Sequence, residues 1–345
     1  MKIAYIVPSL AATAPIFIAK RLTDYFLSKG NEVEVFYFDA KYGTDFKCRT
    51  IQIKMNEPIN FDSFDIVHSH MMRPDKYVAK FSEKIDRTKT ISTIHCNIKD
   101  DLSYSYGKII SEIFTRKWLA ALKKIDCTIQ INNYLLDLYK RELPQSCLIY
   151  NGISISNEED DYSEIYKKIE EFKTQKLSVL CSYSGIVERK GLMQILKLLK
   201  LRSDITYVCI GEGKQKEKLI QFANKNGISD RIFFSKFKKN PYHVMKFCDV
   251  FMIPSYSEGF SLALLEAGSI GSSVVCSDIP AFNMAFSKDE VSFFKLNDIQ
   301  SLSSAVDEAM KFSEHKKESL KKKIDGYFSE QKMFEEYEKV YKILI

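Results

Sequence analysis

Two glutamates eight positions apart stand in the stretch of sequence with the clearest chemical pattern. Residues 255–279 read SYSEGFSLALLEAGSIGSSVVCSDI, in which Glu258 and Glu266 flank a Gly-Phe-Ser turn. Ser257 or Ser261 can cap the helix that begins with LALLEA, because a serine oxygen accepts a hydrogen bond from a first-turn N–H. The start of a helix also offers N–H groups and a positive dipole end to a phosphate. We therefore expect both acids to accept hydrogen bonds from ligand hydroxyls on either side of a phosphate.

The surroundings of this pair distinguish it from the usual alternative, which is a solvated loop glutamate followed by a glutamate that complements the helix dipole. The predicted strand CDVFMIP runs directly into the loop, and the predicted strand SSVVCSDI follows the helix. The acids therefore lie at the carboxyl end of a strand in a βαβ unit. Ligands of open α/β sheets bind at that edge, so the pattern predicts a binding site.

A second candidate site follows an earlier strand, in the run SGIVERKG at residues 184–191. Gly185 permits close approach of the backbone to a ligand, and Arg189 and Lys190 supply two positive charges suited to a diphosphate. A basic pair considered alone is more often a solvated surface pair. Its position at a strand end, in the same half of the chain as the two glutamates, favours a diphosphate site.

Three histidines of the first half lie at the ends of predicted strands: His68, His70 and His95. A His-x-His pair can bind a metal ion, but no acidic or cysteine partner accompanies it at a suitable spacing, and no Asp-x-Asp follows a strand. We therefore predict no metal site, and we expect one or two of the three to be structural. His95, in the run STIHCN, is the candidate for a hydrogen bond to a neutral ligand group.

Other catalytic patterns are incomplete in this sequence. The turn Gly211-Glu212-Gly213 lacks the third glycine of a dinucleotide fingerprint and lies late in the chain, so we interpret it as a strand-to-helix turn near the cleft. No G-x-S-x-G elbow occurs, which argues against a Ser-His-Asp triad. An NAD-dependent dehydrogenase is disfavoured because no fingerprint follows the first strand.

Alternating strands and helices must position these residues. The opening strand, helix and strand imply a parallel sheet with right-handed crossovers, and the alternation restarts after Tyr150-Asn151-Gly152-Ile153. We predict two doubly wound domains, residues 1–150 and 151–328, because 345 residues exceed the size of one core. The predicted strands are 2–8, 32–38, 66–70, 90–95, 128–131, 147–150, 177–183, 206–210, 232–234, 250–253 and 273–276. The predicted helices are 15–29, 77–85, 106–124 and 134–142.

Two further segments have a distinct pattern. Residues 329–345 carry apolar and aromatic side chains at helical spacing. One face of this helix must be buried, and we expect it to pack back on the first domain. The polar run at residues 156–161 is expected to form a surface loop.

The composition is that of a soluble globular protein, with 45% hydrophobic and 28% charged residues. No run of about 18 apolar residues occurs and the first residues form a predicted strand rather than a leader, so we expect a cytoplasmic protein. The 8 cysteines form no Cys-x-x-Cys pair and are expected to be reduced. The net charge of +6 is too small to predict a nucleic-acid partner.

Residues 106–124, YGKIISEIFTRKWLAALKK, mix apolar side chains with a cationic cluster. A core helix with a basic solvent face explains this mixture. Peripheral contact with a membrane surface is the alternative, because the segment also contains the only tryptophan beside several lysines and an arginine.

Taken together, these runs resemble glycosyltransferase family 4, whose members are retaining nucleotide-sugar enzymes of the GT-B fold. SEGFSLALLEA is similar to the E-x7-E signature, SGIVERKGLMQIL to the strand-Gly-Arg-Lys-Gly-helix element, and YNGIS to the interdomain stretch. VCIGEGKQKEKL is similar to the strand followed by Gly-x-Gly, and HSH and TIHCN fall where the family carries its histidines. The resemblance implies two Rossmann-like doubly wound parallel-sheet domains that face a cleft, with residues 1–150 on the acceptor side and residues 151–328 binding the donor.

The resemblance also implies roles for the charged candidates. Glu258 would contact hydroxyls of the donor sugar, and Glu266 would hold the ribose hydroxyls. Arg189 and Lys190 would neutralise the leaving diphosphate, while His95 would contact the transferred sugar. Catalysis would stabilise an oxocarbenium-like state without a metal ion, a cofactor or a protein nucleophile. The acceptor would attack the face that the diphosphate leaves.

Backbone and aromatic groups complete the implied donor site. Amides of residues 259–262 would face the sugar and phosphate, and the base would lie against residues 235–237. The chain departs from the family at residues 10–14, where Leu-Ala-Ala-Thr-Ala replaces a Gly-Gly pair that approaches donor phosphate and acceptor. The implied donor-binding residues besides Glu266 are Gly185, Phe237, Gly259, Phe260, Ser261 and Leu262.

We therefore expect a retaining glycosyltransferase that moves a sugar from a nucleotide-sugar, with a UDP-sugar favoured, to a glycan or lipid-linked saccharide. Its expected setting is bacterial surface polysaccharide biosynthesis (O-antigen, capsule or exopolysaccharide) in the cytoplasm, with association with the inner face of the cytoplasmic membrane left open. Two alternatives remain open: a GT-B-like nucleotide-sugar epimerase, which needs no acceptor, and a non-catalytic nucleotide-sugar-binding protein, which transfers nothing.

Overall fold

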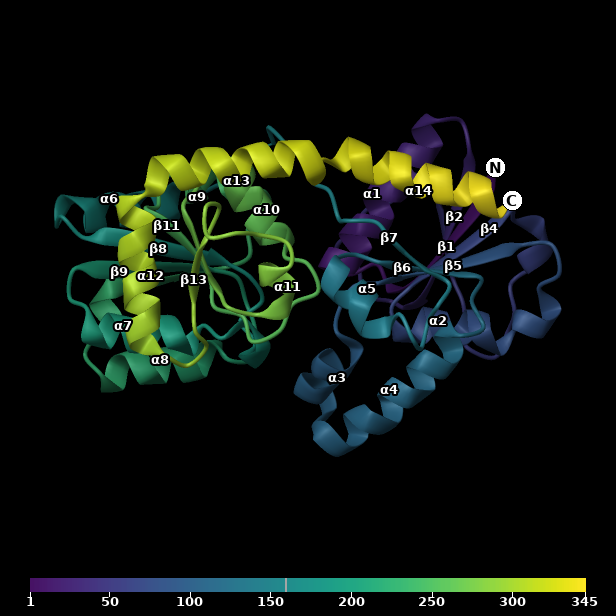
Figure 1. The fold of residues 1–345 in the computed structure, drawn as a ribbon, viewed down its shortest axis with the longest axis horizontal. Coiled ribbons are helices and arrows are strands. Elements are labelled where there is room, and N and C mark those ends of the chain that lie inside the picture. The colour runs from purple at the N-terminus through teal and green to yellow at the C-terminus, as the bar shows by residue number, and fades with distance from the viewer. Residues whose placement is uncertain (159) are drawn as a thin grey trace. The chain divides into compact units, whose positions relative to one another are not determined.

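The computed structural model describes residues 1–158 and 160–345. The chain forms two compact α/β units, Met1–Asn151 with Glu330–Ile345, and Gly152–Ser329 (Figure 1). The predicted surface loop at residues 156–161 contains Glu159, which lies outside the described residues. Among the described residues, no helix combines the length and the apolar character needed to cross a membrane.

The described part of the first unit contains a sheet of seven parallel strands in the order β3-β2-β1-β4-β5-β6-β7. Strand β1 is almost entirely buried, as expected for a run of aliphatic residues in a parallel sheet with both faces covered. The strand order reverses between β1 and β4, so the loops after these strands diverge at a topological switch point. The strands are β1 (Lys2–Ser9), β2 (Glu32–Asp39), β3 (Arg49–Gln52), β4 (Ile66–His70), β5 (Lys89–Ile94), β6 (Cys127–Gln130) and β7 (Ser146–Leu148). The helices are α1 (Ala14–Ser28), α2 (Met72–Lys80), α3 (Ile98–Tyr106), α4 (Lys108–Leu122), α5 (Asn133–Tyr139) and α14 (Glu330–Leu344), with short 3₁₀ turns η1 (Phe61–Ser63) and η2 (Ser82–Lys84).

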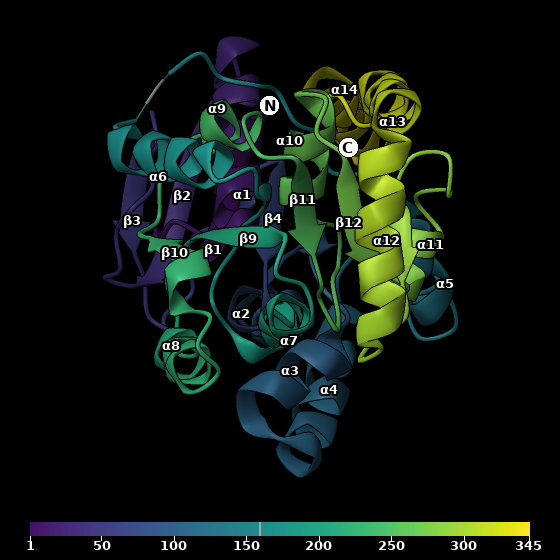
Figure 2. The same cartoon turned by 90° about the vertical axis from the view of Figure 1, so that its left-hand side faces the viewer.

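The second unit repeats this plan with six parallel strands among its described residues, in the order β10-β9-β8-β11-β12-β13. Here the order reverses between β8 and β11. Helices α7, α8 and α12 cover one face of the sheet, and α6, α9 and α10 lie on the other (Figure 2). The strands are β8 (Ser178–Tyr183), β9 (Ile205–Ile210), β10 (Ile232–Ser235), β11 (Val250–Ile253), β12 (Val274–Ser277) and β13 (Ser292–Phe294). The helices are α6 (Ser163–Thr174), α7 (Met193–Leu201), α8 (Lys216–Lys225), α9 (Tyr242–Met245), α10 (Leu262–Ser269), α11 (Pro280–Asn283), α12 (Ile299–Lys311) and α13 (Ser313–Tyr327), with 3₁₀ turns η3 (Glu188–Lys190) and η4 (Ser229–Arg231).

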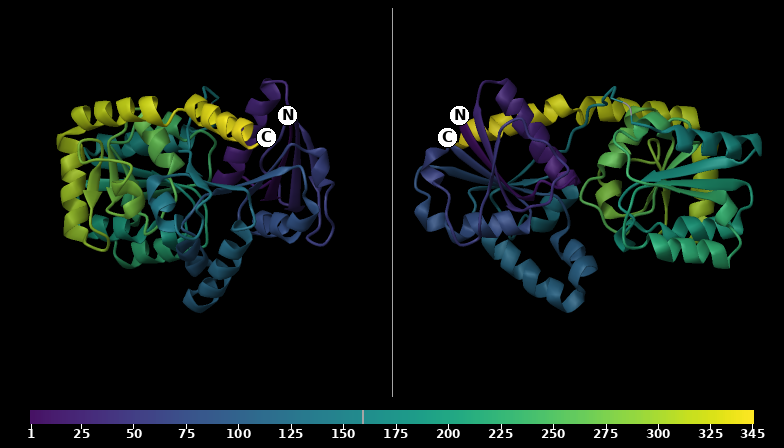
Figure 3. Two further views of the ribbon diagram at one scale, coloured as in Figure 1. Left: turned by 45° about the vertical axis from the view of Figure 1, so that its right-hand side comes forward. Right: turned by 180° about the vertical axis from the view of Figure 1, so that it is seen from behind.

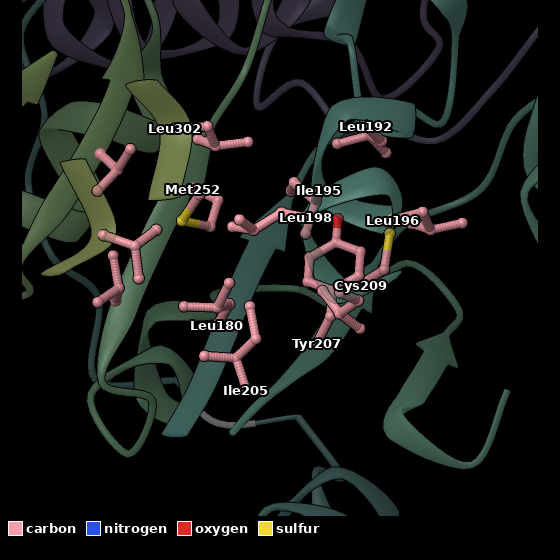
Figure 4. Close-up of a cluster of buried hydrophobic side chains, with 14 of the residues drawn as sticks. Leu180, Leu192, Ile195, Leu196, Leu198, Ile205, Tyr207, Cys209, Met252 and Leu302 are labelled. Atoms are coloured by element: carbon pink, nitrogen blue, oxygen red, sulfur yellow. The ribbon is translucent and has the colours of Figure 1, made fainter. Parts of the chain in front are cut away.

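One hydrophobic core cluster of the second unit lies under α7, α8 and α12 (Figure 4). Leu180 and Met252 from the central strands pack in the same cluster as Ile195 and Leu198 from α7. Full burial of such a side chain stabilises the fold by about 1.5–3 kcal/mol. The core therefore fixes the ends of β8 and β11, where the candidate loops begin.

Most predicted strands and helices are confirmed, with ends shifted by a few residues. The predicted helix 77–85 is displaced, since α2 begins at Met72 and ends at Lys80. The sequence predicts neither β3 nor β13. Strand β3 lies at the sheet edge with mostly exposed side chains, so it lacks an apolar alternation. Strand β13 has 3 residues, which is too short to show a pattern.

The predicted helix 106–124 is wrong in one respect, because Gly107 interrupts it with φ of +80°. Helices α3 and α4 therefore form a hairpin, which projects from the sheet of the first unit in both views of Figure 3. Trp118 in the second half of α4 is buried, but Ile109 and Ile113 are 83% and 51% exposed. The expectation of a core helix with a basic solvent face therefore fails for the first half of α4.

Helix α14 belongs to the first unit. Its ring of Tyr341 stacks on Phe26 of α1 with centroids 4.7 Å apart, and Phe334 stacks on Tyr25 at 4.6 Å. Tyr337 is fully buried as well. The aromatic spacing in the sequence is thus the buried face of this helix.

Candidate active site

The two candidate loops of the second unit leave the sheet at neighbouring strands. Strands β8 and β11 pair directly, although about seventy residues separate them in the chain. The loop at residues 184–191 follows β8, and the loop at residues 254–261 follows β11. Both therefore start at the carboxyl edge of the sheet, at the switch point where α/β proteins bind ligands.

A buried carboxylate joins these loops. Glu258 is 6% exposed, and its Oε1 lies 2.6 Å from Lys190 Nζ while its Oε2 lies 3.3 Å from Arg189 Nη1. Ser255 Oγ also donates a hydrogen bond of 2.6 Å to Oε1. Burial alone would raise the pKa of Glu258, but the charges of Lys190 and Arg189 lower the pKa to about 2. The carboxylate is therefore ionised at neutral pH.

The sequence does not predict a contact between Glu258 and the basic pair. Glu258 and the basic pair were assigned to separate parts of the ligand, whereas the structure places the three charges in one cluster. One acid and two bases leave a net charge of +1. The side chains of Arg189 and Lys190 remain 22% and 20% exposed, so both still present charge to solvent. The cluster can therefore attract an anion while the carboxylate holds the cations in place.

The turn that carries the basic pair is docked on the second loop through its backbone. Tyr256 N donates to Arg189 O at 2.8 Å, and Gln194 Nε2 donates to Pro254 O at 2.9 Å. Gly191 has φ of +65°, and a Cβ at this position would lie 2.0 Å from Pro254 O. Only glycine fits there without displacing one loop from the other.

Gly185, Gly211 and Gly213 differ in how closely other atoms of the second unit pack against them. A Cβ on Gly211 or Gly213 would lie 2.0 Å or 2.3 Å from a carbonyl oxygen of residues 184–186, so this turn is packed backbone to backbone, which confirms its interpretation as a strand-to-helix turn. A Cβ on Gly185 would lie 3.9 Å from Glu212 O, an ordinary contact. Packing within the unit therefore does not require a glycine at residue 185, and the expected close approach of its backbone to a ligand stays a prediction.

The start of α10 is capped and anchored. Of the two candidate serines, Ser261 is the cap, since its Oγ accepts a hydrogen bond from Leu264 N at 3.3 Å. Phe260 is 7% exposed and packs against Phe328 with ring centroids 5.1 Å apart, next to Phe286. The phenyl ring of Phe260 is thus a structural anchor. What the segment Gly259–Leu262 can offer a ligand is its backbone.

A small pocket opens between the two loops. Tyr183, Lys190, Ser255 and Ser261 are among the residues that line it. The ring of Tyr183 lies 5.8 Å from that of Phe237, which is 45% exposed. Sequence reasoning missed Tyr183 and Ser255. Their only signal is position, since Tyr183 ends β8 and Ser255 comes two residues after β11.

Glu266 lies in α10, one turn beyond the cap, and is partly buried. Burial raises the pKa of Tyr183, and the charge of Glu266 raises it further. The charge of the second glutamate therefore acts on the hydroxyl of Tyr183, which lines the pocket, while the first glutamate is in the ion cluster.

The predicted histidines belong to the first unit. His95 Nε2 lies 2.8 Å from His70 Nδ1, just beyond the end of β5. His68 is bonded at both ring nitrogens, to Tyr341 at 2.6 Å and to Thr93 at 2.8 Å, so it is structural. Residues 1–158 and 160–345 contain no group of three or more His, Cys, Asp and Glu side chains arranged to hold a metal ion.

The alanine-rich loop at residues 10–14 follows β1 at the switch point of the first unit. Leu10 N donates to Lys41 O and Thr44 N donates to Leu10 O, both at 2.9 Å. A Cβ on Gly43 would lie 3.0 Å from Ala12 N, so the loop packs tightly on its neighbour. The methyl groups of Ala11, Ala12 and Ala14 are therefore carried by a backbone that is held in place at the carboxyl edge of the first sheet.

The chain is similar to known proteins of one family. The model described as Glycosyl transferases group 1 matches residues 163–325, which contain both loops. The chain is 30% identical over 355 aligned positions to the O-antigen biosynthesis glycosyltransferase WclY of Escherichia coli, covering 99% of this chain and 98% of that one. The chain belongs to the group 1 glycosyltransferases. This glycosyltransferase is also 28% identical over 137 residues, 39% of the chain and 36% of the relative, to a Campylobacter jejuni N-acetylgalactosaminyltransferase named for a diphospho-undecaprenol substrate.

The fold of the glycosyltransferase is GT-B, with two Rossmann-like parallel-sheet units. The solved structure of HepE from Anabaena in complex with UDP-glucose aligns over 99% of both chains with a TM-score of 0.82 at 15% identity. Such low identity with such high structural similarity shows a shared fold. The predicted fold class is therefore confirmed.

Proposed function

We propose that this glycosyltransferase transfers a sugar from a UDP-sugar to a glycan or lipid-linked saccharide during synthesis of a bacterial surface polysaccharide. The cluster of Glu258, Arg189 and Lys190 beside the capped start of α10 carries the proposal, because it joins fixed positive charge to backbone N–H groups at the switch point. The name of WclY supports the polysaccharide setting, and the UDP-glucose complex of HepE supports the donor. In this proposal the protein is a retaining enzyme of family 4, and Glu258 with Glu266 forms its E-x7-E signature.

The donor would lie with its diphosphate between the ion cluster and α10. As the bond from sugar to diphosphate breaks, negative charge grows on the leaving oxygen. Lys190 and Arg189 are already fixed by Glu258, so they stabilise that charge without reorganising. Glu258 keeps the two cations in register. A carboxylate has about four acceptor sites, so it also retains room for a hydroxyl of the donor sugar.

The remaining donor contacts are proposed for Tyr183, which lines the pocket, and for three residues outside its lining. Glu266 would accept the ribose hydroxyls, and the exposed ring of Phe237 with Tyr183 would stack on the base. Gly185 would leave room for the phosphates. We propose that the positive charges make a metal ion unnecessary and that the acceptor attacks the face from which the diphosphate departs.

The α3–α4 hairpin supports a peripheral membrane contact of the first unit, which we propose as the acceptor side, while Gly152–Ser329 binds the donor. Ile109 and Ile113 are exposed on the same helix as Arg116, which pairs with Glu112 as Lys99 of α3 does; the side chains of Arg116 and Lys99 are 78% and 64% exposed. An apolar face rimmed by cations fits the interface of an anionic membrane. Such a contact would bring the enzyme to a lipid-linked acceptor at the cytoplasmic face.

A nucleotide-sugar panel tests the donor assignment. A donor present at about 100 times its dissociation constant stabilises the protein by about 2.7 kcal/mol, a measurable rise in melting temperature. Donor turnover is then measured with lipid-linked saccharides in buffer with and without EDTA. Isomerised donor without acceptor would indicate the epimerase alternative, and binding without product would indicate a binding protein. A Glu266→Ala protein with wild-type donor affinity and turnover would refute the site.

A further inference from the structure

The first unit holds a row of three histidine rings at the ends of β4 and β5. The ring of His70 stacks between those of His68 and His95, with centroids 4.3 Å and 5.2 Å away. His70 Nδ1 lies at hydrogen-bond distance from His95 Nε2, 2.8 Å. The His70 side chain is fully buried, whereas His95 is only partly buried. His70 therefore connects the interior of the unit to a ring that a ligand can reach.

All three rings are neutral at physiological pH. Burial lowers the pKa of His68 and of His70 well below the usual value, and it lowers the pKa of His95 to about 3. A neutral imidazole carries one proton, so in the bond between His70 and His95 one ring donates and the other accepts. The direction of this bond decides which nitrogen of His95 carries its proton.

The second ring nitrogen of His70 determines that direction. His70 Nε2 is buried and has no hydrogen-bond partner within the part of the chain that the structure describes. A buried N–H without an acceptor is rarer than a buried acceptor without a donor. The proton of His70 therefore belongs on Nδ1, which donates to His95 Nε2. The proton of His95 must then be on its Nδ1.

We infer that His70 is a positioning residue that holds His95 in its Nδ1–H tautomer and so makes His95 a hydrogen-bond donor to an oxygen of the sugar. This inference rests on the proposed function, in which His95 contacts the transferred sugar. A neutral N–H suits a hydroxyl or ring oxygen of an uncharged group. In this role His95 keeps its proton throughout the reaction.

Two neighbouring features keep the His70 ring in place. On one side, His68 is fixed at both nitrogens by Tyr341 of α14 and Thr93 of β5. On the other, the ring of His95 stacks against it. The backbone of the next residue, Met71, has φ of +78° and ψ of 164°, a conformation almost restricted to glycine. Such strain costs about 1–3 kcal/mol and persists where the surrounding structure fixes a functional group.

Nitrogen NMR of the wild-type protein tests the tautomer directly. In protein labelled with nitrogen-15 at histidine, we expect His95 to show a protonated Nδ1 and an unprotonated Nε2, with signals assigned by their loss in a His95→Gln variant. A protonated Nε2 on His95 would overturn the inference, whatever the activity of the enzyme.

Two substitutions of His70 then separate positioning from a merely structural role. Asparagine places an N–H donor near the position of Nδ1, and leucine fills the space without one. We expect His70→Leu to lower kcat/KM about 10-fold, equivalent to about 1.4 kcal/mol, and His70→Asn to recover most of that loss. Equal losses in two folded variants would contradict the inference. Full activity of a His95→Ala protein would instead refute the proposed role of His95 and leave the tautomer result standing.

Discussion

Replacing Glu258 by glutamine tests whether the ion cluster holds the two loops together. The substitution keeps the shape of the side chain but removes the charge that Lys190 and Arg189 face at 2.6 Å and 3.3 Å. A pKa that falls from 4.5 to about 2 corresponds to about 3 kcal/mol of stabilisation at neutral pH. We expect Glu258→Gln to lose about this amount, because it leaves two cations without their counter-charge.

The pH dependence of the loss follows from the same pKa. Because the folded state lowers the pKa of Glu258, its contribution is complete above about pH 4.5 and disappears as the pH falls toward 2. The difference in unfolding free energy between wild type and Glu258→Gln should therefore be largest at pH 7 and vanish near pH 2.

Urea unfolding followed by two signals measures this effect. Trp118 is the only tryptophan and lies in the first unit, so its fluorescence follows that unit, whereas far-ultraviolet circular dichroism follows both. We expect the dichroism transition to shift more than the fluorescence transition.

Sugar transfer by Glu258→Gln should also fall at least about 100-fold. Glu188→Gln, the same change at an exposed acid of the neighbouring turn, is the matched control. Equal stabilities of wild type and Glu258→Gln at pH 7, with the same acid slope, would refute the reasoning.

Three further predictions concern other parts of the chain. Gly191→Ala should lower the unfolding free energy by more than about 2 kcal/mol, because its Cβ would meet a carbonyl oxygen at 2.0 Å, whereas Gly185→Ala should stay within about 0.5 kcal/mol and weaken donor binding in calorimetry. Asp75 of α2 is fully buried, and burial raises the pKa of its carboxyl group from 3.8 to about 6. Its contribution to the unfolding free energy should therefore fall by about 3 kcal/mol as the pH rises from about 4 to 7, so the difference in unfolding free energy between wild type and Asp75→Asn should change by this amount over that range. Replacing Ile109 and Ile113 together by serine should reduce sedimentation with anionic vesicles at least about 10-fold at unchanged melting temperature; unaltered vesicle binding would contradict the membrane proposal.

Most of the fold can be predicted from the sequence, because parallel strands that are buried on both faces consist of short apolar runs between helical patterns. Strand β1 and its neighbours follow this rule. The rule fails for β3, whose side chains are mostly exposed at the sheet edge. An apolar pattern in the sequence also does not show whether another element packs against that face of the helix. For this reason Ile109, which is exposed, is predicted to lie in a core helix.

The candidate site was only partly predictable for a topological reason. The motifs around Arg189 and Glu258 are visible as strand-end loops, so their place at one sheet edge follows from the alternation. Their direct pairing depends on β8 and β11 being neighbours, and strand order is a property of the whole sheet. The same holds for Tyr183 and Ser255, whose residue types alone carry no site signal.

The aromatic anchor of Phe260 has a mechanical consequence. Phe328, on which its ring packs, stands one residue before the chain leaves the second unit, and its carbonyl oxygen accepts a hydrogen bond from Ile153, just after the chain enters it. One aromatic contact and one hydrogen bond therefore connect the loop at residues 254–261 to both points where the chain crosses between the units. We expect a displacement of the backbone at Gly259 or Ser261 to disturb the packing of Phe328, next to the residues where the chain enters and leaves this unit.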